Sequence, residues 1–461
     1  MLIKNKVYPG ITIEQINNLG FGVCRIESIV VFTAGVVTGD VCDIRIIKVH
    51  KTWCVGKAEC IRTLSPLRRE KALTCAVSPR CGGCVYDAIT YSQELHLKQE
   101  DVVHALKKAG AAGYAVADVD TDNRITGYRN KAQYPVGTDS EGNICFGFYA
   151  PRSHRVIDAA ACKLQPKIFG QIARRVCDIA AKNGVKPYDE TTHSGVLRHI
   201  CLRCNADADQ IMLVLVINAK ELPCAEQFSA IAEEFPQIVC FGFSTNEKPD
   251  NTVMGKSFVL LRGKDYILDT LCGRTLAVSP LSFYQVNHDM AQRLYQKAGE
   301  LLNLQPGEKL LDLYCGIGSI GLCVARQDTV LIGVEIIPQA VENAKENAAR
   351  NRMENAAFYC ADAAQIASLQ NGKLLQTPFD AVIVDPPRKG LDEAAIRAVC
   401  QMSPKRIVYI SCAPDTLARD LVRFAAQGYR GDTVYPFDLF PRTGHVESVV
   451  LLTKSHKKLI L

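Results

Sequence analysis

Apolar and polar positions follow two different rhythms along this 461-residue chain. From about residue 305, short apolar runs alternate with segments of helical spacing, and this alternation predicts a doubly wound parallel sheet. The first 65 residues instead carry several short strands between glycine turns, which is typical of a small β-barrel of the oligonucleotide-binding type. Strands of the sheet are expected at 309–315, 329–335, 356–361, 380–385 and 406–411, with a closing pair near 431–437 and 446–452.

Short strands and helices are mixed between these two regions, so the predicted fold class is α/β with an additional barrel and a central α+β domain. Residues 91–110 place Leu95, Val102 and Leu106 on one face of a helix that could pack on the C-terminal domain. We expect three domains, at residues 1–65, 66–280 and 281–461.

Composition and charge narrow the class of protein. The chain is 48% apolar and 22% charged, which excludes disordered and collagen-like proteins. No apolar run approaches the ~18 residues that span a bilayer, and the first residues lack a signal-peptide core. We therefore expect a cytoplasmic protein with no membrane partner and no evident obligate protein partner. Residues 1–70 hold ten Lys or Arg against six Asp or Glu, typical of a solvated barrel surface or of one facing RNA phosphates.

A glycine-rich segment follows the first predicted strand of the C-terminal sheet. Gly316, Gly318 and Gly321 form G-x-G-x-x-G, and Glu335 lies nineteen residues after the first of them. Such glycines let the backbone approach a nucleotide, and the acid can bind ribose hydroxyls. Asp312 within the strand, and the lack of adjacent positive charge for a pyrophosphate, favour S-adenosylmethionine over a dinucleotide. A nicotinamide-dependent oxidoreductase is the alternative.

Two further acidic residues follow strands of the predicted sheet, Asp362 after the third and Asp385 after the fourth. One aspartate at such a position is commonly a helix cap, but four acidic residues around a glycine loop favour cofactor binding. Cys412 follows the fifth strand at a helix entrance, where a lowered pKa would suit a nucleophile, and Glu447 could supply a base. From residue type alone, a buried structural thiol is the more common role.

Four segments together carry a family resemblance. They are Asp312-Leu-Tyr-Cys-Gly-Ile-Gly, Asp385-Pro-Pro-Arg-Lys-Gly, Ser411-Cys-Ala-Pro-Asp-Thr-Leu-Ala-Arg-Asp and Phe440-Pro-Arg-Thr-Gly-His-Val-Glu. Over nearly the whole chain the sequence resembles the RNA uracil-5-methyltransferases, including members that begin with a TRAM domain, a small RNA-binding β-barrel. The resemblance implies methyl transfer from S-adenosylmethionine to C5 of uridine in RNA.

The resemblance also implies roles for single residues. Cys412 would add to C6 of the uracil, and Glu447 would accept the proton from C5. Many relatives have Asn at the position of Ala413, which affects a contact beside the nucleophile. Ser319 and Asp362 are weaker matches to cofactor positions. The implied cofactor contacts are Gln285, Tyr314, Glu335 and Asp385.

Four cysteines stand apart from the other sixteen. Cys75, Cys81 and Cys84 form C-x5-C-G-G-C, and Cys162 follows at a distance. Four thiolates can hold zinc or an iron–sulfur cluster, and their spacing alone slightly favours zinc. The resemblance implies instead the 4Fe–4S cluster of the ribosomal-RNA members. The separate pair in Cys201-Leu-Arg-Cys204 would face opposite sides of a strand, which predicts packing.

The same resemblance bears on the substrate. The TRAM domain and the cluster indicate 23S ribosomal RNA, and transfer RNA is the alternative because members acting on it usually lack both. A non-catalytic RNA-binding factor is a second class of function, which the intact Cys412–Glu447 pair disfavours. Tyr128-Arg129-Asn130-Lys131 resembles a segment that contacts RNA in the family, so we predict an RNA contact there.

Overall fold

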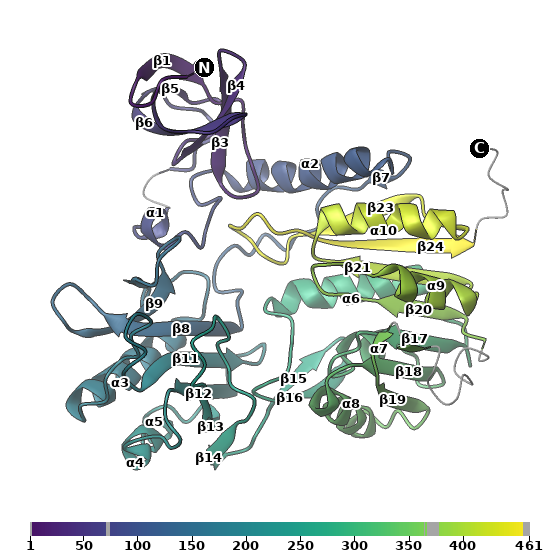
Figure 1. Cartoon of the computed structure of the whole chain (residues 1–461). Coiled ribbons are helices and arrows are strands. Elements are labelled where there is room, and N and C mark those ends of the chain that lie inside the picture. The colour runs from purple at the N-terminus through teal and green to yellow at the C-terminus, as the bar shows by residue number, and fades with distance from the viewer. Residues whose placement is uncertain (1, 71–73, 364, 367–377, 455–461) are drawn as a thin grey trace.

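The computed structural model describes residues 2–70, 74–363, 365–366 and 378–454, whose strands form four sheets (Figure 1). The first is a six-stranded sheet in the order β1-β5-β6-β4-β3-β2, and contacts between β1 and β3 curl it on itself. Alternating apolar residues, among them Val31, Ile44 and Cys54, fill a core of its own. Its strands are β1 (Val7–Thr12), β2 (Gln15–Ile16), β3 (Phe21–Ile26), β4 (Ile29–Ala34), β5 (Val41–Val49) and β6 (Trp53–Thr63).

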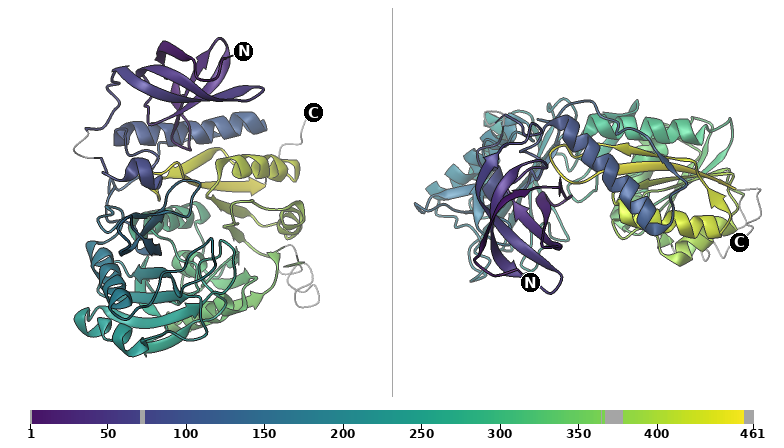
Figure 2. Two further views of the ribbon diagram at one scale, coloured as in Figure 1. Left: turned by 60° about the vertical axis from the view of Figure 1, so that its left-hand side comes forward. Right: turned by 90° about the horizontal axis from the view of Figure 1, so that it is seen from above.

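Helix α2 (Tyr91–Ala109) lies between this sheet and the C-terminal part of the chain (Figure 2). The Thr90 side chain accepts a hydrogen bond from the Gln93 N–H at its start, and Gly110, with φ of 79°, ends it. Its buried face, which includes Val102 and Leu106, belongs to the same apolar cluster as helix α10 (Pro414–Ala426). The short helix α1 (Ser78–Cys81) precedes α2.

The central sheet has seven strands in the order β10-β9-β8-β11-β12-β13-β14. Cys201 packs in the core shared with the C-terminal sheet, whereas Cys204 packs in the core under α3. The two thiols therefore face opposite sides of β11, which confirms their prediction as packing residues. The elements are β8 (Lys131–Thr138), β9 (Ile144–Tyr149), β10 (Val156–Asp158), α3 (Lys167–Lys182), β11 (Leu197–Cys204), β12 (Ile211–Ile217), α4 (Ala225–Ser229), α5 (Ile231–Glu234), β13 (Ile238–Thr245) and β14 (Val259–Gly263).

The C-terminal sheet runs β19-β18-β17-β20-β21-β24-β23-β7, with β22 also paired to β24. The strands from β19 to β21 are parallel, and β24 is antiparallel to β21. This is the predicted doubly wound arrangement, and each predicted strand is present within a few residues. The strands are β7 (Ala115–Val116), β17 (Lys309–Leu313), β18 (Val330–Glu335), β19 (Ala356–Cys360), β20 (Ala381–Val384), β21 (Arg406–Ser411), β22 (Tyr429–Arg430), β23 (Thr433–Phe437) and β24 (Glu447–Lys454).

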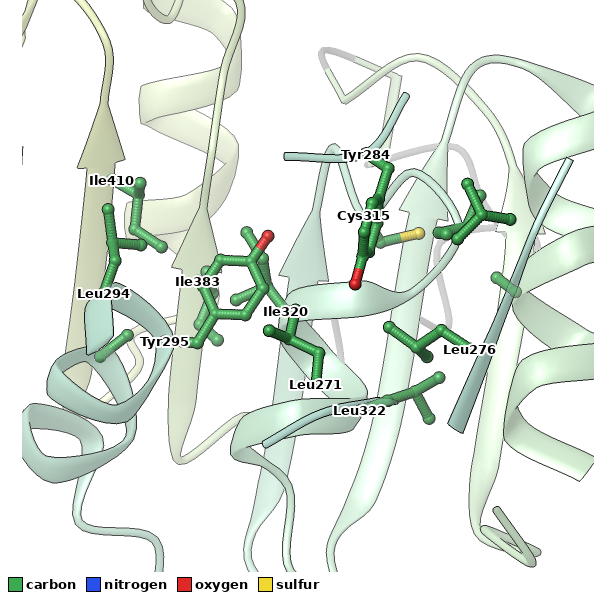
Figure 3. Close-up of a cluster of buried hydrophobic side chains, with 14 of the residues drawn as sticks. Leu271, Leu276, Tyr284, Leu294, Tyr295, Cys315, Ile320, Leu322, Ile383 and Ile410 are labelled. Atoms are coloured by element: carbon green, nitrogen blue, oxygen red, sulfur yellow. The ribbon is translucent and has the colours of Figure 1, made fainter. Parts of the chain in front are cut away.

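Helices cover the faces of this sheet. Leu294 and Tyr295 of α6 pack in one cluster with Ile383 and Ile410 of the sheet (Figure 3). The same cluster includes Leu271 and other apolar side chains of the hairpin β15–β16. Among the described residues, no helix is both long and apolar enough to cross a membrane. The remaining elements are β15 (Ile267–Leu271), β16 (Arg274–Val278), α6 (His288–Leu302), α7 (Ser319–Val324), α8 (Pro338–Arg350) and α9 (Glu393–Gln401).

A buried ion network joins α2 to the loop between β23 and β24. The Lys98 ammonium donates to Glu94 Oε1 at 2.8 Å, to Asp438 Oδ1 at 2.6 Å and to the Phe440 carbonyl at 3.2 Å. Glu94 also accepts from the Arg442 backbone N–H at 2.6 Å. The side chains of Lys98, Glu94 and Asp438 are at most 1% exposed. Every charge in the network has a partner, which a buried ionic group requires.

The barrel touches the same loop. A Cβ atom on Gly444 would lie 1.9 Å from the Asn18 carbonyl oxygen, so only glycine fits at this contact. Tyr86 Oη, just before α2, donates to the Asn17 carbonyl at 3.4 Å. The turn at residues 17–20 of the barrel therefore packs directly on the loop that precedes β24.

We expect Lys98→Met to lower the free energy of unfolding by about 3–5 kcal/mol, because it removes the buried cation that Glu94 and Asp438 share. Lys108→Met on the same helix is the matched control, since Lys108 and its partner Asp415 are 80% and 73% exposed and such pairs contribute little. Urea unfolding followed by circular dichroism measures both variants. Equal effects of the two substitutions would contradict the role of the network.

Candidate active site

Strand pairing brings Cys412 and Glu447 together. In the antiparallel pair β21–β24, Ser411 is the partner of Ser448, so the next residue of one strand faces the preceding residue of the other. Cys412 and Glu447 are those residues, on one face of the sheet at the carboxyl end of β21. The Glu447 side chain is buried and its charge acts on the thiol. The two proposed catalytic residues, separated by 35 positions in the sequence, are thus neighbours.

The pKa of Cys412 differs from the prediction. Burial, followed by the negative charges of Glu447 and Asp385, raises the pKa of this thiol to about 11, and Arg388 opposes the rise. The expected lowering at a helix entrance was wrong, because the burial and the two carboxylates outweigh the amino end of α10. At neutral pH the thiol is protonated, so a thiolate at this position needs additional stabilisation.

Glu447 has a pKa suited to proton transfer near neutral pH. Burial, with the charge of Asp385 next, raises the pKa of Glu447 to about 8, and Arg388 again opposes the rise. Burial also raises the pKa of Asp385 to about 7. A base is most effective when its pKa lies near the working pH. Arg388 Nη2 lies 3.1 Å from His445 Nε2, which places this cation beside the loop that leads into β24.

The glycine loop follows β17 and has an unusual backbone. Tyr314, Gly316 and Gly318 have φ values of 64°, 55° and 78°, in the left-handed region. Asp312 Oδ2 accepts from the Gly321 N–H at 2.9 Å and holds the start of α7 against the strand. Asp312 Oδ1 is buried without a hydrogen-bond partner in the described part of the chain. Burial raises the pKa of this carboxyl to about 8.

Glu335 ends β18 beside this loop. Its Oε2 accepts from the Gly316 N–H at 3.1 Å, and its Oε1 accepts from the N–H groups of Ile336 and Ile337 at 2.8 and 3.0 Å. Both isoleucine side chains are exposed, at 59% and 57%, and form an apolar surface next to the carboxylate. The strand order reverses at β17 and β20, where doubly wound sheets bind ligands. The Glu335 carboxylate and the exposed apolar surface beside the glycine loop fit an adenosyl group.

Tyr314 belongs to the glycine loop, and Gln285 follows Tyr284, which packs in one apolar cluster with Cys315 of that loop. The Tyr314 N–H donates to the Val334 carbonyl at 2.9 Å, and burial raises the pKa of its hydroxyl to about 12. Gln285 is buried, and its carbonyl accepts from Asn130 Nδ2 at 2.9 Å, which ties it to the central domain. The structure thus brings Cys412, Glu447 and Asp385 into electrostatic contact, and Glu335 into contact with Asp312 and Tyr314.

Sequence reasoning assigned no role to two residues at this site. Tyr295 on α6 is buried and hydrogen-bonds to Ser319 at the start of α7. Burial, and then the negative charge of Asp385, raises the pKa of its hydroxyl. Its position in the helical pattern is that of an ordinary core residue, so the sequence pattern could not show that it lies at this site. Arg388 was part of the quoted motif, but only the fold shows that its charge reaches both Cys412 and Glu447.

The four separate cysteines lie close enough to interact. The pKa of Cys84 is raised to about 12, by burial first and then by the charges of Cys162, Asp87, Cys81 and Cys75. Cys81 and Cys75 likewise raise the pKa of Cys162 after burial. Across the ranges that the structure describes, however, no three His, Cys, Asp or Glu side chains are arranged to hold a metal ion. The fold therefore places the four thiols near one another, but the described residues are not arranged as metal ligands.

The segment predicted to contact RNA is largely buried. Tyr128 Oη donates to the Pro441 carbonyl at 2.9 Å, and the Asn130 side chain is bonded to Gln285. Burial, then the charge of Arg203, lowers the pKa of Lys131 to about 8. The burial of Tyr128 and Asn130 does not support a direct RNA contact by these two side chains. They join the central domain to the loop before β24 and to the start of α6.

Known proteins resemble this chain over part or nearly all of its length. The family of tRNA (uracil-5-)-methyltransferases matches residues 260–455. Uncharacterized RNA methyltransferases from Clostridium tetani and Halalkalibacterium halodurans are each 37% identical over 451 residues, covering 97–98% of this chain and 97% of each relative. The crystal structure of Pyrococcus abyssi tRNA (uracil-54, C5)-methyltransferase with S-adenosyl-L-homocysteine is 26% identical, covers 96% of this chain and 99% of that one, and has a TM-score of 0.77.

The fold and the glycine loop define a Rossmann-like methyltransferase that uses S-adenosylmethionine. The chain belongs to the RNA uracil-5-methyltransferase family, as its sequence motifs predicted. The alternative of a nicotinamide-dependent oxidoreductase is wrong, because the relatives that span nearly the whole chain are methyltransferases.

We expect the reaction of Cys412 with iodoacetamide to accelerate as the pH rises toward about 11, because only the thiolate reacts. Glu447→Gln removes a negative charge that raises this pKa, so alkylation of Cys412 at pH 9 should become faster. Peptide mapping by mass spectrometry measures the rate, with the exposed Cys360 in the same samples as the internal reference. A slower or unchanged reaction in the variant would contradict the contact.

Proposed function

We propose that this enzyme methylates C5 of specific uridines in cytoplasmic RNA through a covalent bond between Cys412 and C6 of the uracil. The observation that carries the proposal is the strand register that sets Cys412 opposite Glu447. A nucleophile and a neighbouring base are the two groups that such a reaction needs. We further propose that Gln285, Tyr314, Glu335 and Asp385 hold the cofactor.

Each proposed step assigns one bond change to a residue. The Cys412 thiolate adds to C6, and the electron pair of the C5–C6 double bond moves onto the ring as an enolate. S-adenosylmethionine, when bound, would supply the methyl group: C5 would become bonded to it as the methyl–sulfur bond breaks, its electron pair stays on sulfur, and S-adenosylhomocysteine leaves. Glu447 then removes the proton from C5, and the re-formed double bond expels the Cys412 thiolate. Arg388 favours both anionic side chains, because its charge lowers the pKa of each.

We expect Cys412→Ala to abolish methyl transfer and adduct formation, because it removes the thiol that is proposed to add to C6. Glu447→Gln should form the adduct but fail to release it, giving a shifted band of RNA-bound protein on a denaturing gel. Cys360→Ala, at an exposed position away from Cys412, is the control and should retain activity. Methyl transfer from labelled cofactor to RNA measures turnover, and full activity of Cys412→Ala would refute the mechanism.

For the substrate we propose 23S ribosomal RNA, supported by the four cysteines and the predicted TRAM domain. Transfer RNA is the second candidate, because the Pyrococcus abyssi enzyme, whose structure covers 96% of this chain, is a tRNA methyltransferase. Mapping 5-methyluridine in RNA from cells that lack the gene separates them. Loss confined to transfer RNA would overturn the ribosomal proposal.

We propose three functional regions: a TRAM domain at 1–65 that faces RNA, a central domain at 66–280, and the methyltransferase domain at 281–461. The four thiols of the central region would hold a 4Fe–4S cluster with a structural role, and zinc is the alternative. Their mutual effect on pKa supports a shared site. The absence of a formed ligand shell among the described residues means that binding would have to draw the thiols closer. The proposed ligands are Cys75, Cys81, Cys84 and Cys162.

We expect anaerobically purified protein to be brown, with about four iron and four sulfide per chain. Cys84→Ser should lose most of the visible absorbance, because it removes the thiol that all three others affect. Cys204→Ser, in a separate core, is the control and should keep the colour. Colourless protein with stoichiometric zinc would refute the cluster.

A further inference from the structure

Two cysteines that play no part in the proposed reaction lie side by side in the C-terminal part of the molecule. Cys272 occupies the turn between β15 and β16, and Cys323 lies in the last turn of α7. A hydrogen bond joins the two thiols. Leu271 and Leu322, which precede the two cysteines, pack in one apolar cluster (Figure 3). The fold therefore brings together two thiols that are far apart in the sequence.

The backbone on both sides of this thiol pair is fixed by other hydrogen bonds. Arg274 Nε donates to the Leu322 carbonyl at 3.1 Å, and Arg274 Nη2 donates to the Ala325 carbonyl at 2.9 Å. These carbonyls lie at the carboxyl end of α7, where a cation is favourable. The Cys272 N–H donates to Gln292 Oε1 at 3.3 Å, which ties the turn to α6. The hairpin is thus docked on the end of α7 independently of the two thiols.

The turn itself does not account for a cysteine at position 272. Cys272 and Gly273 have φ values of 50° and 74°, both in the left-handed region. Two-residue hairpin turns with positive φ at both central positions favour Asn followed by Gly, because Asn tolerates this backbone better than most side chains. Cysteine is therefore a strained choice at the first of these positions, and its side chain is the feature that distinguishes the turn.

The surroundings make the two thiols unequal. The hydrogen bond from Cys323 lowers the pKa of Cys272, burial opposes this effect, and the charge of His288 lowers the pKa further. The same hydrogen bond, together with burial, raises the pKa of Cys323 well above its ordinary value. Cys272 is thus the thiol that ionises more readily, and Cys323 stays protonated beside it. Thiol–disulfide exchange needs such a division between an attacking thiol and a second thiol that resolves the intermediate.

We propose that Cys272 and Cys323 form a reversible disulfide, which fastens the β15–β16 hairpin to α7, when they meet a small disulfide such as oxidised glutathione. The Cys272 thiolate attacks one sulfur of the small disulfide, so a mixed disulfide forms and one glutathione thiolate leaves. Cys323 then loses its proton and attacks the Cys272 sulfur, which expels the second glutathione thiolate. The two protein thiols lose two electrons and two protons, and oxidised glutathione is reduced to two glutathione molecules.

The disulfide would add a covalent link to a helix that starts at the glycine loop. Helix α7 is held at its start by the hydrogen bond between Asp312 and Gly321, and at its end by Arg274. A link between Cys272 and Cys323 also closes a loop of about 50 residues in the unfolded chain, which favours the folded state. In a reducing compartment such a disulfide is transient and forms only under oxidising conditions.

Peptide mapping of the full-length protein tests the proposal without methyl transfer. Anaerobically purified protein is incubated with oxidised glutathione, its remaining thiols are blocked with iodoacetamide, and it is digested with trypsin. We expect a disulfide between the peptides at 265–274 and 310–326, which dithiothreitol reverses. Fragmentation of the second peptide assigns the bond to Cys323 and not to Cys315. Absence of this cross-link, or glutathione that stays attached to Cys272, would overturn the proposal.

Matched variants separate the two steps. Cys272→Asn keeps a residue suited to the turn and should abolish the cross-link, whereas Cys323→Ser should stop the reaction at a mixed disulfide on Cys272. Cys400→Ser, at a half-buried position of α9, is the control and should form the cross-link to the same extent as the wild type. Oxidation should raise the melting temperature of the wild type and the control by several degrees more than that of Cys272→Asn. Equal shifts in all three proteins would overturn the fastening of the hairpin.

Discussion

The position of Glu447, the proposed base, depends on one buried lysine, Lys98. Lys98 is buried on α2, and each of its hydrogen bonds ends on Glu94 or on the segment at residues 438–440. Removing an ammonium group from water costs several kcal/mol, so the arrangement is stable only when all its partners are in place. The loop that leads to Glu447 is therefore held in one conformation by a helix more than 300 positions earlier in the chain.

The same burial that positions the catalytic pair also sets its acid–base properties. Burial raises the pKa of both Cys412 and Glu447, and the negative charge of Asp385 raises each of them further. The site therefore favours the protonated form of Glu447, a carboxyl that is ionised at neutral pH in the unfolded chain, and of Cys412, whose ordinary pKa already lies above neutrality. The charge of Arg388, an exposed residue, lowers the pKa of both Cys412 and Glu447.

The local sequence pattern predicted the helices and strands, but not the contacts between residues that lie far apart in the chain. The strand at Lys309–Leu313 and the helix at Tyr91–Ala109 follow from apolar spacing, which depends on neighbouring residues alone. The lowered pKa expected for Cys412 was wrong because it considered the helix entrance and ignored carboxylates that arrive from other strands. Tyr128 was predicted to contact RNA, since no spacing rule shows that its hydroxyl is bonded to Pro441. Such contacts exist only after the sheets have assembled.

The contact between Gly444 and Asn18 holds the N-terminal barrel against the loop that precedes β24. Two modules joined by a flexible tether must each be immobilised when a ligand bridges them, and that loss of freedom weakens binding. Here the barrel rests with its backbone against the catalytic loop, so the immobilisation has already occurred during folding. The barrel and the C-terminal sheet therefore keep a constant separation, and a ligand that bridges them would meet a single preformed surface.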